Sequence, residues 1–464
     1  MSEQPADKRP GVHASAAHAD GSESADGIIT SAAQPSLTGA SKTTRKPGKF
    51  VTGSLRRHIL VMTGTSAVGL MAIFLGDLAN ILFISMLGDT ALVAAIGYAS
   101  SIVFVMISVG IGLAIGAAAL ISPELGRGNH DLARRYAIHA LIMAAAISAA
   151  FALVVWIFAP TLLRMLGADG RTLDEATVYV RILLASSPML AIGMSCAAIL
   201  RSVGDAQRAM YVTLVGALVN ITLDPILIFV FGLDLVGAAC ASVTARAAVM
   251  LTGLYGVVRV HDLVGKPQPA CLPTDAGRLI HVSGPAMATN LATPFANAYI
   301  TASIAAYGDA AVAGWAIVGR VQPVAFGAIF ALSGAIGPII GQNYGAGAGS
   351  RMREALVEGV RISAVFTALA WVLLAASATL IVDGFKAADD SARLIYLFCY
   401  YLAPLFVFLG LLFVSNAALN TLGRPTASTV LNWGRATLGT IPFVSIGGAL
   451  AGADGVIIGW MVGG

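Results

Sequence analysis

Twelve long apolar stretches, separated by short polar loops, follow one another from residue 58 to the end of the chain. A helix needs about 20 apolar residues to cross the hydrocarbon core of a bilayer, so each stretch is predicted to be a membrane-spanning helix. The last stretch begins near residue 455 and is only about ten residues long, so the chain looks cut within its last span. The predicted spans cover residues 58–87, 91–121, 136–159, 176–199, 209–232, 236–258, 280–307, 311–341, 355–382, 391–419, 428–449 and 455–464.

The two halves of this pattern repeat each other. Gly88-Asp89-Thr90-Ala91 recurs as Gly308-Asp309-Ala310-Ala311, a shift of 220 residues (308 − 88). Each half holds an even number of spans, so the repeats share one orientation and are related by a pseudo-twofold axis along the membrane normal. The sequence therefore predicts an all-α membrane protein, in which twelve transmembrane helices form two six-helix lobes with a cleft between them.

The boundaries of these units follow from composition. Residues 1–52 are rich in Ala, Ser, Gly and Thr and are predicted to be a disordered tail. An N-lobe at 53–260, an inter-lobe loop at 261–279 and a C-lobe at 280–464 follow.

Basic residues are unevenly shared between alternate loops, and this predicts the orientation. The loops on one side carry only Arg164, Arg171 and Lys386. Because loops rich in Arg and Lys face the cytoplasm, the tail and the inter-lobe loop are predicted to be cytoplasmic in a multi-pass protein of the cell (inner) membrane. The loops on that side carry Arg127, Arg134, Arg135, Arg201, Arg208, Arg259, Lys266, Arg278, Arg351, Arg353 and Arg424.

Composition agrees with a membrane protein. The chain is 57% hydrophobic and 11% charged, whereas about 25% of residues are charged in soluble domains. The net charge of +4 is spread between apolar runs, so no nucleic-acid partner is expected. The four cysteines show neither zinc-site spacing nor a disulfide framework.

Two carboxylates lie well inside the apolar stretches, Asp77 in the first span and Asp224 in the fifth. An ionisable group at membrane depth is costly unless it is paired, hydrated or protonated, so it marks an ion or proton pathway. Asn220 stands one helical turn before Asp224 and lies on the same face. Pro225 gives up a backbone donor, which frees carbonyl groups near a cation or a water molecule. The spacing predicts a coupling-ion site; structural carboxylates are the alternative interpretation.

These features together resemble the multidrug and toxic compound extrusion (MATE) family. The resemblance rests on the six-plus-six plan, the Gly-Asp turn after the first span of each half, the loop Arg201-Ser202-Val203-Gly204-Asp205-Ala206 and the run from Gly216 to Pro225. It implies export of amphipathic, often cationic, organic compounds in exchange for H⁺ or Na⁺. A monomer is expected, because the two pseudo-symmetric lobes make one chain sufficient. No catalytic residue and no cofactor are expected.

The resemblance also extends the candidate coupling site beyond Asp77, Asn220 and Asp224, which would be the metal ligands if the ion is sodium. It places Tyr179 of the fourth span in the same network, and Ser242 or Thr244 of the sixth span as hydroxyl donors.

The chain resembles the DinF-like branch of the family more than the NorM-type branch. The seventh span contains no glutamate, and Asn297 stands at the repeat position of Asp77 (297 − 220 = 77). The charged site is therefore predicted in the first half alone. The DinF-like branch often has a proline early in span 1, which allows the helix to bend. This chain has no proline there, so bending of span 1 would depend on the flexibility of Gly64.

Polar residues of the second half are candidates for the substrate cleft, or else for hydrogen bonds that join helices. They are Asn290, Asn297, Arg320 and Gln322.

Two other functions compete with the exporter. A lipid-linked saccharide flippase of the same superfamily would need a more cationic cavity for pyrophosphate. A membrane-embedded enzyme is disfavoured because no His-Glu-x-x-His or Gly-x-Ser-x-Gly motif is present, and the absence of a Walker A motif argues against ATP as the energy source.

Overall fold

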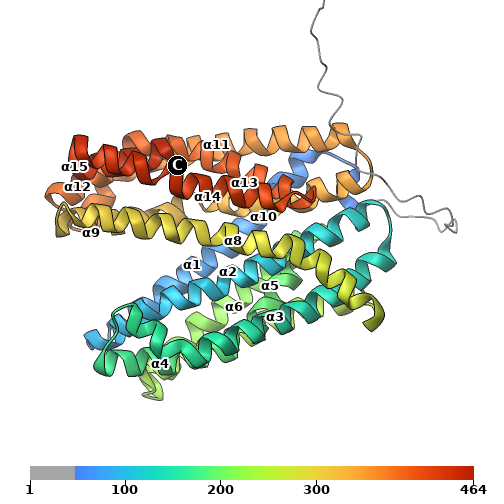
Figure 1. Ribbon diagram of the computed structural model, residues 1–464, viewed down its shortest axis with the longest axis horizontal. Helices are drawn as coiled ribbons and strands as arrows, with labels where there is room; N and C mark the ends of the chain where they lie inside the picture. Colours follow the sequence, from blue (N-terminus) through green and yellow to red (C-terminus); the bar gives the residue numbers. More distant parts are fainter. Residues whose placement is uncertain (1–47) are drawn as a thin grey trace, which may run out of the picture. The chain divides into compact units, whose positions relative to one another are not determined.

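The computed structural model describes residues 48–464, which fold into helices joined by short turns (Figure 1). The elements of the first half are η2 Lys49–Val51, α1 Leu55–Ser85, α2 Thr90–Gly126, α3 His130–Met165, α4 Gly170–Ala185, α5 Ser187–Ser202, α6 Ala206–Pro225, η3 Ile226–Val230, α7 Asp234–Leu254 and η4 Tyr255–Val260. Those of the second half are η5 Pro269–Cys271, α8 Leu272–Ala305, α9 Asp309–Ala325, α10 Gly327–Gly345, α11 Gly349–Gly384, α12 Asp389–Leu397, η6 Phe398–Leu402, η7 Ala403–Leu405, α13 Phe406–Thr421, α14 Pro425–Gly434, η8 Arg435–Gly439 and α15 Ile441–Gly463.

The helices account for the predicted spans one by one. Within residues 48–464, eight helices are long and apolar enough to cross a membrane, and the bent pairs α4–α5 and α9–α10 add two more spans. The other two predicted spans are α8, which is 34 residues long but rich in Thr, Asn and Pro, and the end of α15.

Two spans predicted to be continuous are broken. The helix axis bends by 48° between α4 and α5, and by 47° between α9 and α10. Pro188 lies in the first turn of α5, and Pro323 lies just before the second break. Each proline lacks an N–H and clashes with the preceding turn, which explains the bends.

The end of the chain folds back on itself. Gly452 has φ +61°, a left-handed conformation that glycine adopts without strain, and α15 changes direction there. The segment 453–463 then packs closely along the preceding helix. The two backbones lie so near one another that a Cβ at Gly447 would overlap the carbonyl oxygen of Gly455.

Each half has its own apolar core. One cluster of buried side chains joins α2, α3, α4 and α7 in the first half, and a second joins α8 to α15 in the other. Helices α1, α2, α8 and α10 make most of the contacts between the halves. In Figure 1, α3 to α6 lie on one side of these helices and α11 to α15 on the other.

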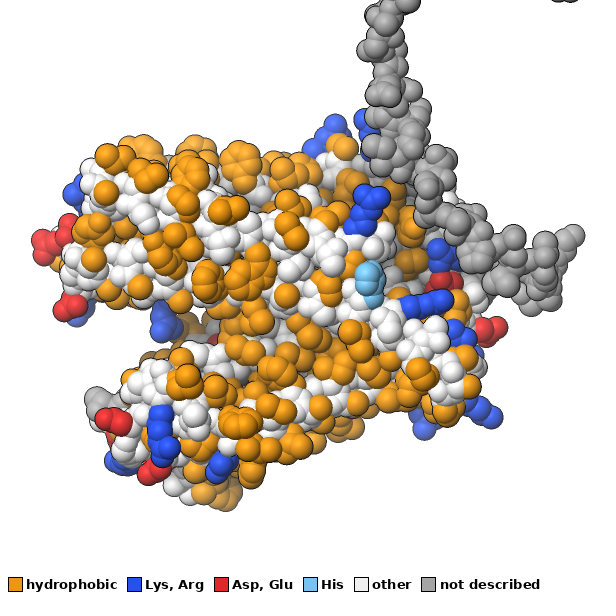
Figure 2. All heavy atoms as spheres, viewed as in Figure 1, with side chains coloured by type: hydrophobic (Ala, Val, Ile, Leu, Met, Phe, Trp, Pro, Cys, Tyr) orange, Lys and Arg blue, Asp and Glu red, His pale blue; other side chains and the backbone are white. Residues whose placement is uncertain are grey.

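The halves touch at one end and part at the other. A Cβ at Gly126 would overlap the carbonyl oxygen of Gln342, and a Cβ at Gly345 would overlap that of Pro123, so the backbones of α2 and α10 meet there. We call this the closed end; it carries the loops 127–129, 203–205 and 346–348. At the opposite, open end, Figure 2 shows a hollow between the halves.

The inter-lobe loop is shorter than predicted, because α8 begins at Leu272 and not near residue 280. Asp275 in its first turn is 2% exposed and accepts hydrogen bonds from Arg135 Nε (3.0 Å) and His139 Nδ1 (2.7 Å) of α3. His139 Nε2 accepts a bond from the backbone N–H of Gln268 (3.2 Å). These contacts hold the start of α8 on the first half and stabilise its extra turns.

The predicted tail at 1–52 needs a correction at its end, and residues 1–47 lie outside the described part of the chain. The prediction of disorder is wrong for 48–52, where η2 forms and Phe50 is 1% exposed. The reason is packing: Phe50 belongs to a buried cluster with Leu55 and Ile59 of α1 and Ile336 of α10.

The loop at 203–205 is also fixed by polar contacts. Asp205 caps α6 by accepting a bond from the backbone N–H of Arg208 (3.1 Å), and it accepts further bonds from the Arg208 guanidinium (2.5 Å) and His261 Nε2 (2.7 Å). Burial raises the pKa of Asp205, but these hydrogen bonds outweigh it and leave the pKa below its ordinary value of 3.8.

Candidate functional site

Asp224 is the centre of the polar site in the first half. It is fully buried, and its Oδ2 accepts hydrogen bonds from Asn80 Nδ2 of α1 (3.0 Å) and Asn220 Nδ2 of α6 (2.8 Å). The predicted pairing of Asn220 with Asp224 through one helical turn is confirmed. Oδ1 is buried and makes no hydrogen bond with any described residue. A buried acceptor without a donor is costly, so this oxygen is suited to take a proton or to ligate a cation.

Close packing of α1 on α6 brings the two asparagines to one carboxylate. Gly69 of α1 lies so near α6 that a Cβ there would overlap the Thr213 hydroxyl. Asn80 stands three residues after Asp77, so both lie on one side of α1. The sequence analysis missed Asn80, which is 8% exposed; its signal was this one-turn spacing from an intramembrane carboxylate.

Asp77 differs from Asp224 in its surroundings. Its side chain is exposed and makes no hydrogen bond with the described residues. It lies eight residues before the end of α1 (85 − 77), about 12 Å along the helix from the open end. The expectation of two carboxylates in one lobe holds, but no direct hydrogen bond joins them.

Tyr179 lies close to both acids. Its side chain is buried on α4, within electrostatic reach of Arg246, Asp224 and Asp77. Arg246 of α7 donates to the carbonyl oxygen of Leu183 (2.6 Å) and to Ser186 Oγ (2.9 Å). The guanidinium therefore satisfies backbone and side-chain acceptors at the break between α4 and α5.

The hydroxyl groups of α7 do not join the network. Thr244 is exposed and donates to the Cys240 carbonyl of its own helix (2.9 Å), and Ser242 is half-buried without a hydrogen bond to a described residue. No hydrogen bond joins either hydroxyl to Asp224 among the described residues. The Thr244 hydroxyl is instead satisfied by a carbonyl group of its own helix.

The four candidates of the second half are not gathered into one polar cluster. Asn290 is half-buried and donates to the Ala286 carbonyl of its own helix (2.8 Å). Asn297 and Arg320 are exposed, and Gln322 is half-buried. Asn297, the repeat partner of Asp77, carries no titrating group.

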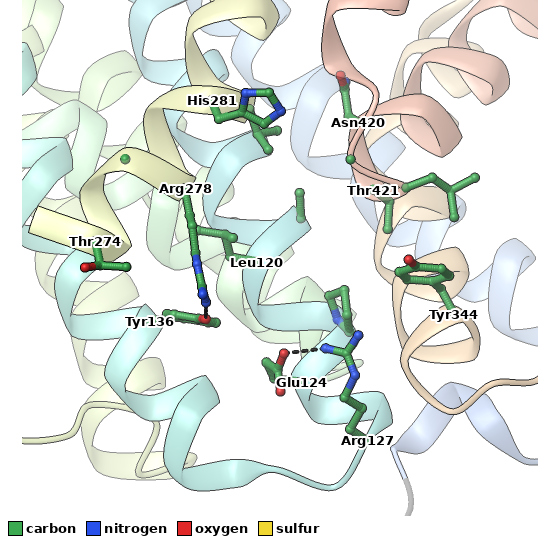
Figure 3. A pocket seen from close by; sticks show the side chains of 16 residues that line it. Leu120, Glu124, Arg127, Tyr136, Thr274, Arg278, His281, Tyr344, Asn420 and Thr421 are labelled. Atoms are coloured by element: carbon green, nitrogen blue, oxygen red, sulfur yellow. Dashed lines mark hydrogen bonds and ion pairs between the residues drawn. The ribbon is translucent and has the colours of Figure 1, made fainter. Parts of the chain in front are cut away.

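A separate cavity of about 530 Å³ lies at the closed end (Figure 3). Arg278 of α8 donates to the Tyr136 hydroxyl, Arg127 pairs with Glu124, and Tyr344 of α10 lies across from them. This cavity is distinct from the acid site, which lies toward the open end.

Two lobes of helices built on a repeated sequence, with a carboxylate buried among the helices, define a class, that of helical membrane transporters. Comparison with known families is consistent with this. The MatE family model matches residues 66–226 and 285–446, one match in each half, and the chain belongs to this family.

Relatives with known names support the same class. The chain is 28% identical over 418 residues to an FAD transporter of Shewanella oneidensis, covering 88% of this chain and 92% of that protein. It is 27% identical over 322 residues to the multidrug export protein MepA of Staphylococcus aureus, covering 66% of this chain and 69% of that protein.

Solved structures have the same fold. A mutant of the Vibrio cholerae MATE transporter VcmN superposes with a TM-score of 0.84 at 25% identity, covering 88% of this chain and 93% of that one. A multidrug resistance MATE transporter described in an outward-facing conformation also gives a TM-score of 0.84, at 23% identity, with 91% and 95% covered.

Proposed function

We propose that the protein is a secondary active exporter that exchanges amphipathic, mostly cationic, organic compounds for protons or sodium ions. The observation that carries this proposal is Asp224, a fully buried carboxylate with one oxygen held by Asn80 and Asn220 and the other free of hydrogen bonds. The multidrug export protein MepA among its relatives supports the substrate class.

The closed end faces the cytoplasm in this proposal. It carries the loops rich in arginine, and the positive-inside rule places such loops in the cytoplasm. The hollow at the open end is then the outward-facing cleft.

The exchange follows from differential binding. A cation bound at Asp224 or Asp77 cancels negative charge in the first half, and this weakens the attraction for a cationic compound in the same cleft. The compound then leaves on the outer side. The bound ion is released to the cytoplasm when the protein adopts the inward-open conformation. Coupling needs only that ion and compound favour different conformations or exclude one another.

The two ions make different demands on the asparagines. In the present hydrogen bonds both amide nitrogens point at Asp224, so the amide oxygens point away from it. Sodium ligation would require at least one amide to turn over, whereas a proton fits on Oδ1 with the network unchanged. The arrangement supports a proton more directly.

A second substrate class is supported by one observation. The relative from Shewanella oneidensis is an FAD transporter and matches 88% of this chain. FAD is an anionic dinucleotide, so its export would depend on cationic rather than acidic groups. A lipid-linked saccharide flippase would likewise handle a pyrophosphate.

Purified protein in liposomes distinguishes these substrates. Ethidium, FAD and a fluorescent lipid-linked pyrophosphate are each tested with an imposed pH gradient and, separately, an imposed sodium gradient. We expect ethidium to move with one gradient and to stop when that gradient is collapsed. Movement of FAD or the lipid alone would overturn the cationic substrate class.

A further inference from the structure

The segment 48–53 crosses the closed end between the two halves. The backbone N–H of Phe50 donates to Gln342 Oε1 of α10 (2.8 Å). The carbonyl oxygen of Phe50 accepts bonds from Asn343 Nδ2 (3.2 Å) and Arg351 Nη2 (3.2 Å), and that of Gly53 accepts from Arg351 Nη2 (3.0 Å). These contacts bind the segment to the second half.

Two polar contacts bind the same segment to the first half, which it joins covalently at α1. His58 Nε2 donates to the carbonyl oxygen of Thr52 (2.9 Å). Lys49 Nζ donates to the carbonyl oxygen of Gly204 (2.7 Å), in the loop between α5 and α6. Gly204 has φ +85°, and a side chain there would meet both Lys49 and Phe50. The loop is therefore shaped to receive the segment.

Gln342 connects all of these elements. It is 1% exposed; while Oε1 accepts from Phe50, its Nε2 donates to the carbonyl oxygen of Ser202 at the end of α5 (2.6 Å). Ser202 Oγ in turn accepts a bond from Ser122 of α2 (3.0 Å). Both ends of one buried amide thus join the second half to the first half and to the segment 48–53.

Packing adds to these bonds. Phe50 lies in a buried cluster that also contains Ala206 of α6, Ile336 of α10 and Val414 of α13. Its aromatic ring packs edge-on against His58, with ring centroids 5.3 Å apart. Opening of this end would expose apolar surface from both halves, in addition to breaking the hydrogen bonds.

We infer that Gln342 and the segment 48–53 form a latch that holds the closed end shut and must release for the cleft to open on this side. The inference rests on the proposed exporter, which requires both ends of the cleft to open in turn. Gln342 is a positioning residue: it touches no substrate, and it sets the balance between the two conformations.

The contacts also predict where the latch parts. Four hydrogen bonds hold the segment to the second half, and two hold it to the first, from Lys49 to Gly204 and from His58 to Thr52. The segment also continues covalently into α1 of the first half, so the latch parts where Phe50 and Gly53 meet α10 and α11 and where Gln342 meets Ser202.

The distance between the halves tests this inference directly. Spin labels are placed on exposed sites at the closed end, His130→Cys on α3 and Ser350→Cys on α11, in a background with the four native cysteines replaced. A second pair, Asp169→Cys and Ala388→Cys, reports on the open end. Pulsed electron spin resonance gives the distance distribution for each pair in reconstituted protein.

Gln342→Met keeps the side-chain volume and removes both amide bonds. We expect the population with a longer closed-end distance to increase at least fivefold, because a hydrogen bond contributes about 1 kcal/mol net. Lys49→Met should give a smaller increase in the same direction. Gln268→Met, the same change at an exposed glutamine, is the matched control and should leave both distributions unchanged.

Unchanged closed-end distances in Gln342→Met and in Lys49→Met would overturn the latch. If Gln342→Met does not fold, the distance distribution of Lys49→Met decides the question alone. The readout needs no substrate, so a wild-type protein that exports nothing in liposomes would refute the exporter and leave the distance result standing.

Discussion

Asn80→Ala tests whether the amides at Asp224 tune the affinity for the coupling ion. The substitution removes the 3.0 Å bond to Oδ2 and leaves the 2.8 Å bond from Asn220 in place. A hydrogen bond to a charged group contributes about 1.5 to 3 kcal/mol, and its loss disfavours the bare carboxylate. The ion-loaded state then gains by the same amount.

This free energy sets the size of the expected shift. Taking the lower bound of about 1.5 kcal/mol, the half-saturating ion concentration should fall about tenfold, because 1.4 kcal/mol corresponds to a factor of ten. For a proton this is about one pH unit toward higher pH. The maximum rate should change less, since Asp224 itself remains.

Dye export from proteoliposomes, measured against external pH and against sodium, gives the half-saturation value. Asn432→Ala is the matched control, since Asn432 is a buried asparagine that donates to Asn416 in the second half (2.9 Å). It should lower the unfolding temperature without moving half-saturation. A shift of Asn80→Ala in the opposite direction, or none, would refute the reasoning.

Three further substitutions test other parts of the structure. Tyr179→Phe should shift the pH profile of transport and keep most of the maximum rate, because the phenol lies within reach of both acids; an unchanged profile would make it a packing residue. Asp275→Asn leaves two basic groups of α3 without their buried partner and should lower the free energy of unfolding by about 3 kcal/mol, measured by thermal unfolding in detergent. The pKa of Asp205 is lowered, so its stabilisation is present above its ordinary value of 3.8 and is lost as the pH falls through the lower value. Asp205→Asn should therefore lower the unfolding temperature at pH 7, and the difference from wild type should shrink as the pH falls through the lowered pKa.

The repeated apolar pattern was sufficient to predict the helices and the two lobes, because span length and loop charge depend on the bilayer alone. It could not predict the breaks at residue 186 and near Pro323. A proline within a helix is tolerated in some packings and bends the axis in others. The packing of the neighbouring helices therefore decides whether the axis bends.

The candidate site around Asp224 was predicted only in part, because only one of its hydrogen bonds follows from local helix geometry. Asn220 and Asp224 lie one turn apart on one helix, so their hydrogen bond follows from local geometry. Asn80 reaches Asp224 only through the packing of α1 on α6, which joins residues 144 positions apart. The sequence pattern holds no periodicity that encodes this approach.

The sequence did not predict the packing of the segment 48–53, because its composition resembles that of the polar tail before it. The residues before the first span look like the end of a polar tail, yet Phe50 is buried between the halves. A single aromatic side chain in a polar stretch has no periodic signal, and only its pocket reveals its role.

Export driven by an imposed ion gradient is the most direct test of the central claim. Wild-type protein in liposomes is compared with Asp224→Asn and Asp77→Asn, and with Asp234→Asn as the control, since Asp234 is an exposed aspartate at the start of α7. We predict that wild type and the control export ethidium when the gradient is applied, and that both intramembrane variants, folded and reconstituted equally, do not. Gradient-driven export by Asp224→Asn at the wild-type rate would contradict the assignment of ion coupling to the first half.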